Sequence, residues 1–261
     1  PGQVIGVEGI AAGPRVTASY ELPGITPVVS YGEGFRSLDA QTLTEGSTPY
    51  SKIRSVEAGF RAQTPRERYA TTLSLFETWV GNELVFEAAS GGMQTENASV
   101  RRGVVGSVLA KPFDWLLVSS ALSVTSATFS TLVVGVGHDV PNIPPVLFRT
   151  DVTARGTLAR WRGRPVTGHV GVGYTFLSGR HLTDSIVGPS SNVLNAKAAV
   201  RYGWLEVGAD AYNLLGLHYA DDAQYYVSNW GFSNTQQRAS EAIHVTAAPP
   251  LTVLGTVALY F

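Results

Sequence analysis

The sequence of 261 residues contains no cysteine and only one methionine. The absence of cysteine excludes disulfides, thiol nucleophiles and zinc sites built from thiolates. Charged residues are also scarce, because they make up 15% of the chain against about 25% in soluble proteins, and the formal net charge is -1. A nucleic-acid partner would require a basic excess, so this composition argues against one.

Long hydrophobic runs are missing as well. No stretch reaches the roughly 18 apolar residues that a membrane-spanning helix needs, although the mean hydropathy of +0.07 is high. Alternating β-strands offer such a chain another way to place its apolar surface. The sequence starts at Pro1 without a charged or apolar leader, so we expect that a signal peptide was removed or lies upstream.

The last stretch, residues 251–261, alternates most clearly. Its odd positions are Leu251, Val253, Gly255, Val257, Leu259 and Phe261. In a soluble protein such a strand would be an aggregation-prone sheet edge, whereas a closed membrane barrel gives it two partner strands and lipid outside. An apolar strand that ends in Phe resembles the C-terminal signal of bacterial outer-membrane barrels. The resemblance implies that Val257, Leu259 and Phe261 form a signal for the barrel assembly machinery.

The same alternation recurs along the chain and predicts eleven antiparallel strands. We expect them at residues 14–22, 25–35, 52–62, 68–86, 95–110, 115–129, 146–160, 166–177, 193–202, 204–215 and 251–261. Short and longer connections alternate between them. Outer-membrane barrels have short periplasmic turns and longer extracellular loops, so this parity places Phe261 on the periplasmic side. Aromatic residues near strand ends would form the interfacial girdles: Tyr69, Trp115, Trp161, Tyr202, Trp204 and Tyr260.

Charged side chains occupy alternate positions in several of these strands, opposite an apolar face. They are Arg149, Asp151, Arg155, Lys197, Arg201, Glu206 and Asp210. Such a row would be costly in a packed core but suits a water-filled lumen. These charges could contact a plug or guide an anionic substrate. The structural alternative, which we favour, is that they pair with one another around the inner wall.

The longest predicted connection, residues 216–243, is rich in aromatic and polar residues. Tyr219, Tyr225, Tyr226, Trp230 and Phe232 are our candidates for substrate contact, because aromatic rings give a large contact area at low entropy cost. Packing of the loop on itself is the alternative.

Six sequence fragments carry a family resemblance. They are SYGEGFR (30–36), SVEAGFR (55–61), NASVRRGV (97–104), VPNIPP (140–145), DAYNLLGLHYAD (210–221) and PPLTVLGTVALYF (249–261). In this order, and over nearly the whole chain, they resemble segments of the barrel of TonB-dependent outer-membrane receptors. All six resemble segments of the C-terminal half of that barrel.

The resemblance implies an all-β, antiparallel transmembrane barrel of twenty-two strands, of which about eleven are present here. It also implies uptake of a scarce nutrient, such as a ferric siderophore, through an N-terminal plug driven by TonB, with no catalysis and no cofactor. An isolated half barrel would leave two unpaired edges in lipid. We therefore expect residues 1–261 to be the C-terminal part of an outer-membrane barrel, with the plug and the N-terminal strands on the same or another chain.

Two other functions are weighed against this interpretation. A complete barrel of about twelve strands would be a passive porin or a structural or adhesive barrel, and it would need Val4 to Ala11 as its twelfth strand. An outer-membrane hydrolase is disfavoured because the sequence has no GxSxG elbow. The five histidines have no metal-ligand spacing, so we expect no metal site. The glycines at 168, 171 and 173 alternate within a strand, unlike those of a nucleotide-binding loop.

Overall fold

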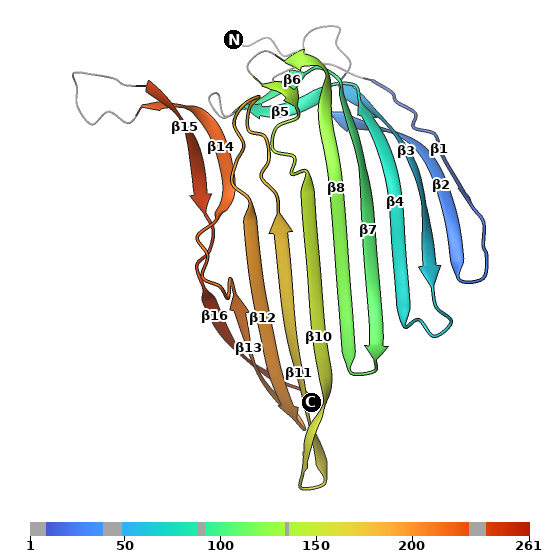
Figure 1. Ribbon diagram of the computed structural model, residues 1–261, viewed down its shortest axis with the longest axis vertical. Helices are drawn as coiled ribbons and strands as arrows, with labels where there is room; N and C mark the ends of the chain where they lie inside the picture. Colours follow the sequence, from blue (N-terminus) through green and yellow to red (C-terminus); the bar gives the residue numbers. More distant parts are fainter. Residues whose placement is uncertain (1–8, 39–48, 88–91, 134–135, 230–238) are drawn as a thin grey trace.

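The described part of the chain is one curved sheet with two small hairpins attached to it (Figure 1). The computed structural model describes residues 9–38, 49–87, 92–133, 136–229 and 239–261. Eleven strands run side by side along the sheet, each antiparallel to its neighbours. In spatial order they are β1 (Arg15–Ser19), β2 (Ile25–Ser37), β3 (Tyr50–Gln63), β4 (Tyr69–Val80), β7 (Ser99–Phe113), β8 (Leu116–Val133), β10 (Val146–Trp161), β11 (Arg164–Leu177), β12 (Ser191–Tyr202), β13 (Leu205–Tyr212) and β16 (Thr252–Leu259). The number and direction of these strands confirm the predicted all-β antiparallel wall.

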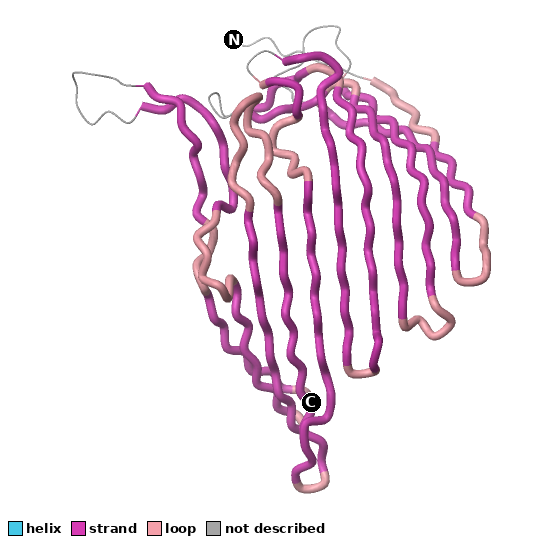
Figure 2. Tube along the Cα trace, viewed as in Figure 1, coloured by secondary structure: helices cyan, strands magenta, loops and turns pink. Residues whose placement is uncertain are grey.

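The connections at the two ends of the strands differ. Short turns lie at the lower end in Figure 1, whereas the longer connections lie at the upper end. The sheet is open within the described residues, since β1 and β16 stand at opposite ends of the strand order. Most of the described trace is strand, and the rest is loop or turn, as Figure 2 shows. Among the described residues, no helix is long and apolar enough to cross a membrane.

Three predicted stretches are assigned wrongly, all of them at the end with the longer connections, and the strand predicted at 95–110 begins only at Ser99. The strand predicted at 68–86 stops at Val80, and β5 (Glu83–Glu87) pairs with β6 (Gly92–Glu96) in a separate hairpin. The predicted loop 130–145 contains the end of β8 and the short β9 (Gly137–Asp139). The predicted loop 216–243 contains β14 (Ala220–Asn229) and part of β15 (Ala239–Ala247), which pair with each other. In each case a locally paired hairpin occupies a stretch that we expected to continue the wall or to be irregular.

The outer face of the sheet is apolar and uncovered in the described part of the chain. Val200, Val207 and Val257 lie side by side on β12, β13 and β16 and are 46%, 51% and 70% exposed. A patch of this kind is rare on a soluble monomer and suits a surface bathed in hydrocarbon. Buried apolar residues gather instead at the end with the longer connections, where Ala127, Phe129, Val133 and Val140 form a small core.

Asn213 fixes the exit of the chain from β13. It is 2% exposed and has a φ of 51°, a conformation that asparagine tolerates better than most residues. Its side-chain oxygen accepts the Leu217 amide, and its nitrogen donates to the carbonyls of Leu217 and Pro249. These bonds give a physical reason for the asparagine in the NLLG fragment, because they join the start of the long connection to its end.

Candidate functional site

The seven predicted lumen charges lie on one face of the sheet. The register places Asp151 opposite Gly173, Lys197 opposite both Gly171 and Asp210, and Arg201 opposite Glu206. Since directly paired residues share a face, these positions all lie on the face opposite the exposed valines. Arg149, Arg155 and Glu206 follow the same alternation on β10 and β13.

Two hollows divide these charges between them. The first, of about 730 Å³, is lined by Arg155, Arg201 and Glu206 together with His169 and Trp115. The second, of about 410 Å³, is lined by Arg149, Asp151, Lys197 and Asp210 together with Tyr212. The sheet therefore has a charged inner face with two shallow cavities.

Glycines on β11 make room for the charged side chains. A Cβ atom added at Gly171 would lie 2.9 Å from Cε of Lys197, and one at Gly173 would lie 2.6 Å from Oδ1 of Asp151. Both distances are shorter than van der Waals contact, so a larger residue at either position would push the charged side chain away. The alternation of glycines in this strand thus shapes the hollow and is unrelated to a phosphate loop.

Most of these charges do not pair with one another. Arg149 and Asp151 form an ion pair, with Nε and Oδ2 2.8 Å apart. The guanidinium of Arg201 lies 3.9 Å from the centre of the Tyr260 ring, and the Tyr260 hydroxyl donates to Glu206 over 3.4 Å. Among the described residues, Arg155, Lys197, Glu206 and Asp210 form no ion pair. Salt bridging around the wall, the alternative that we favoured, therefore holds for one pair only.

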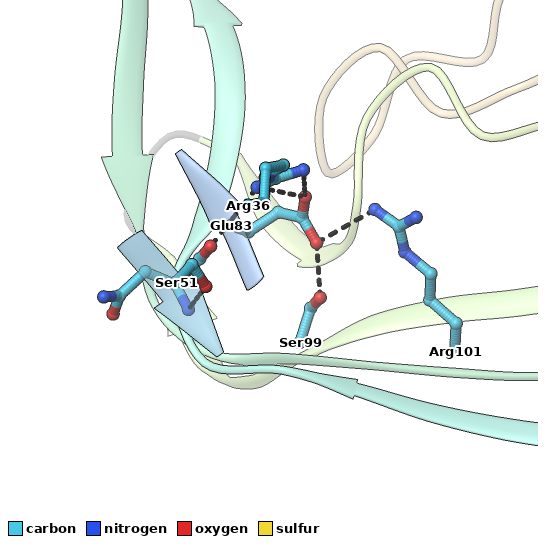
Figure 3. A network of polar contacts seen from close by, with 6 residues as sticks. Arg36, Ser51, Glu83, Ser99 and Arg101 are labelled. Carbon is cyan, nitrogen blue, oxygen red and sulfur yellow. Dashed lines mark hydrogen bonds and ion pairs between the residues drawn. The ribbon is translucent and has the colours of Figure 1, made fainter. Parts of the chain in front are cut away.

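A second cluster, at the upper rim in Figure 1, was missed by the sequence reasoning. Glu83 at the start of β5 is 1% exposed, and its carboxylate lies between two guanidinium groups (Figure 3). Nη2 of Arg36 lies 3.2 Å from Oε1, and Nη2 of Arg101 lies 3.0 Å from Oε2, which also accepts the Ser99 hydroxyl. Burial of a carboxylate is tolerated here because both of its oxygens are paired.

The same cluster holds the β5–β6 hairpin against the wall. Arg36 also donates to the backbone carbonyl of Asn82, and the backbone N–H of Asn82 donates to the hydroxyl of Ser51. Strands β2, β3 and β7 thus bind the first residues of the hairpin. The signal that could have revealed the break was Gly81-Asn82, a turn-forming pair inside the predicted strand. We call Arg36, Ser51, Glu83, Ser99 and Arg101 the rim cluster.

A third group of contacts joins the connections near β14. Nη2 of Arg180 lies 2.8 Å from Oδ1 of Asp222, and Nε of Arg180 donates to the Asn142 side chain. Burial raises the pKa of Asp222, but hydrogen bonds from Gln224 and from the Ala223 backbone, with the Arg180 charge, outweigh burial and lower the pKa. Arg180 and Asp222 therefore bind the connection after β11 to the start of β14.

The predicted substrate-contact tyrosines pack within their own hairpin or beside it. The Tyr225 hydroxyl donates to Glu241 over 2.7 Å, and this bond raises the pKa of Tyr225. Tyr226 stacks on His244 with ring centres 3.7 Å apart, and the Tyr219 carbonyl accepts the Ala248 amide. Trp230 and Phe232 lie outside the described residues. Substrate contact stays a prediction for all five.

The predicted assembly signal occupies the last strand. Val257 and Leu259 pair with Val207 and Leu205 of β13 and share their outer face. Phe261 follows the strand and is fully exposed. The recognition of these residues by an assembly machinery stays a prediction. In the described part of the chain, no group of three or more acidic or histidine side chains could hold a metal ion.

The comparison with protein families identifies the wall. The model of the TonB-dependent receptor-like β-barrel family matches residues 11–214. The chain belongs to this family. The family is one of outer-membrane receptors of Gram-negative bacteria rather than of enzymes. A search of curated proteins found no match to this TonB-dependent receptor barrel.

Solved receptors have the same fold. The closed form of the ferric-catecholate import receptor Fiu from E. coli K12 is 18% identical, with a TM-score of 0.70, and the match covers 95% of this chain and 34% of Fiu. The ferric yersiniabactin uptake receptor FyuA from Yersinia pestis is 14% identical, with a TM-score of 0.67, covering 95% of this chain and 37% of FyuA. This TonB-dependent receptor barrel therefore spans about a third of the length of these receptors.

Proposed function

We propose that residues 1–261 form the C-terminal half of the barrel of a TonB-dependent outer-membrane transporter that imports a ferric siderophore or a similar scarce nutrient. The remaining strands and the plug come from the same or another polypeptide, and TonB acts through the plug. The short turns and Phe261 lie on the periplasmic side. The longer connections and the hairpins β5–β6 and β14–β15 face the cell exterior.

The observation that carries this proposal is the asymmetry of an open wall. One face is apolar and exposed, the other bears charges that mostly lack ion-pair partners among the described residues, and β1 and β16 end the strand order. In a bilayer both edge strands need partners, and the unpaired inner charges suit a plug or a hydrated substrate. The family match and the iron-chelate receptors among the similar structures support uptake of a ferric chelate.

The inner wall would contribute positive charge to this uptake. Among the seven charged residues of the inner wall, the basic ones outnumber the acidic ones. The basic residues are Arg149, Arg155, Lys197 and Arg201, and the acidic residues are Asp151, Glu206 and Asp210. At the rim, Arg36 and Arg101 share the single carboxylate of Glu83, and the Nε atoms of both arginines are buried without a hydrogen-bond partner in the described chain. A lumen with this excess attracts anionic ferric chelates and raises their local concentration.

The test is energy-dependent uptake by the full receptor in intact cells. Deletion of the gene should slow growth on the cognate iron chelate, and uptake of radioactive iron should stop when the proton-motive force is collapsed or TonB is removed. The reversal Arg155→Glu with Lys197→Glu should lower uptake of an anionic chelate several-fold. Uptake that persists in de-energised cells and is equal for uncharged solutes of similar size would contradict the proposal and favour a passive porin.

A further inference from the structure

The β10–β11 hairpin projects beyond the turns on either side of it. Strand β10 pairs with β8 only as far as Ala154 and Leu116, and β11 pairs with β12 only from Val166 and Tyr202. Residues between Ala154 and Val166 therefore continue past the wall, and the tip of this hairpin reaches the lowest point of the sheet in Figure 1. The tip of the hairpin is therefore flanked by no further strand pairing in the described chain.

The tip of this hairpin is strongly basic. Its sequence, RWRGR at residues 160–164, contains three arginines and no acid. None of the three forms an ion pair with the described residues. Arg162 and Gly163 have φ angles of 48° and 76°, as in a type I′ turn, whose first central position favours Asn, Asp or Gly. An arginine is strained there, and such strain is often found where the side chain has a function.

Two of the arginines flank an aromatic pair on the apolar outer face. The rings of Trp161 and Tyr202 lie 5.1 Å apart, and the Tyr202 hydroxyl donates to the Trp161 carbonyl. The Arg162 guanidinium lies 5.0 Å from the centre of the Trp161 ring. Arg164 pairs with Trp161 across the hairpin, so both share this face, and its Nη1 reaches the turn at Gly203. Arg160 pairs with Pro165 and lies on the other face.

We propose that Arg162 and Arg164, on the outer face of this hairpin, bind the phosphate of an anionic phospholipid in the periplasmic leaflet. A guanidinium group matches a phosphate with two parallel hydrogen bonds, and Trp and Tyr rings settle at the level of lipid headgroups. The combination of exposed aromatic rings with unpaired arginines favours a lipid over a soluble acidic partner, because Trp161 is 56% exposed beside the apolar face. This inference rests on the periplasmic placement of the short turns.

The experiment measures lipid binding by the full receptor in detergent. Phosphatidylglycerol or phosphatidylcholine is titrated in, and native mass spectrometry counts the bound lipid. The variant Arg162→Gln/Arg164→Gln should lower the apparent affinity for phosphatidylglycerol on the order of tenfold and leave phosphatidylcholine unchanged, since each basic residue near an anionic headgroup contributes several-fold. The matched variant Arg66→Gln/Arg160→Gln removes the same charge from the more distant β3–β4 turn and from the inner face of the β10–β11 hairpin. It should keep the wild-type affinity.

Equal loss in the two double variants, or no loss in Arg162→Gln/Arg164→Gln, would overturn the proposal. A second measurement needs no variant: added salt should release phosphatidylglycerol from the wild-type receptor and spare phosphatidylcholine, and insensitivity to salt would also overturn it. Iron uptake by the same variants is read separately. Specific lipid binding without uptake would refute the transport function alone, whereas uptake without specific binding would refute the lipid site alone.

Discussion

The inner face of this barrel wall holds charges in two different settings, at the rim and halfway along the strands. In the rim cluster, Glu83 is almost fully buried and is held by two arginines and a serine. Halfway along the wall, Lys197 and Asp210 lie opposite each other on β12 and β13 but form no ion pair within the described residues. Arg36 and Arg101 lie on the same face of the sheet as Lys197, so the face alone does not decide what a charge does.

The difference follows from how much of its hydration each charged group has lost on burial. Glu83 is desolvated, so its partners must compensate for lost hydration, and removal of one member leaves an uncompensated buried charge. Lys197 and Asp210 line an open hollow and keep their water. The first arrangement stabilises a hairpin, whereas the second leaves charge available to a group from outside this chain.

The largest effect is expected at Glu83. Replacement by alanine leaves Arg36 and Arg101 facing each other without a carboxylate. Because these guanidiniums are about one-third exposed, we expect a loss of about 3 kcal/mol, at the low end for a broken buried pair. The loss should be local and appear as about a hundredfold faster amide exchange over residues 82–85, measured on the full receptor by mass spectrometry.

The matched control for this prediction is Asp114→Ala in the β7–β8 turn. Asp114 pairs with Arg68, but the pair lies at the short turns, outside the wall, and the Asp114 side chain is 95% exposed. An exposed pair contributes below about 1 kcal/mol, so exchange in β5 should not change. Equal effects of the two substitutions would show that burial does not distinguish the rim cluster.

An intermediate effect is expected at Arg180 and Asp222. The pKa of Asp222 is lowered in the folded protein, so its carboxylate stabilises the docked β14 above its ordinary pKa of 3.8. This contribution is lost as the pH falls through the lowered value. Since Asp222 is half-exposed, we expect about 1 kcal/mol. Limited proteolysis near residue 219 should become faster below pH 3.8 in the wild-type receptor. In the Asp222→Asn variant the same cleavage should already be fast at neutral pH.

Asp221→Asn serves as the control, since Asp221 is exposed and forms no ion pair with the described residues. It should retain the pH dependence of the wild type. A wild-type hairpin whose cleavage rate is the same at neutral and acidic pH would refute the role of Asp222.

The wall was predictable because its signal repeats. A period of two over many residues sets both the strands and their faces, and one misplaced residue would turn every side chain of a strand to the wrong face. The register of β10, β11, β12 and β13 accordingly places the seven predicted charges on one face. The parity of the connections is similarly robust, because adjacent antiparallel strands must alternate between the two ends.

The rim was not predictable by the same reasoning. Strand β5 follows β4 after only Gly81 and Asn82 and begins a second apolar stretch at Leu84, so the apolar pattern alone cannot tell one long strand from two shorter ones. The rim cluster also joins residues that are 47 and 18 positions from Glu83. Such contacts depend on how the hairpin folds back over the sheet, which local patterns do not specify.

The smallest effect on stability is expected for Lys197→Met, which keeps the aliphatic stem beside Gly171 and removes only the charge. The free energy of unfolding of the full receptor in urea should stay within about 0.5 kcal/mol of wild type, as for a substitution that breaks no buried contact. A loss above about 1 kcal/mol would show that Lys197 pairs with Asp210 in solution and supports the wall. Unchanged stability with impaired iron uptake would instead separate the two settings. Charge at the rim would hold the β5–β6 hairpin against the wall, and charge halfway along the wall would act on the transported solute.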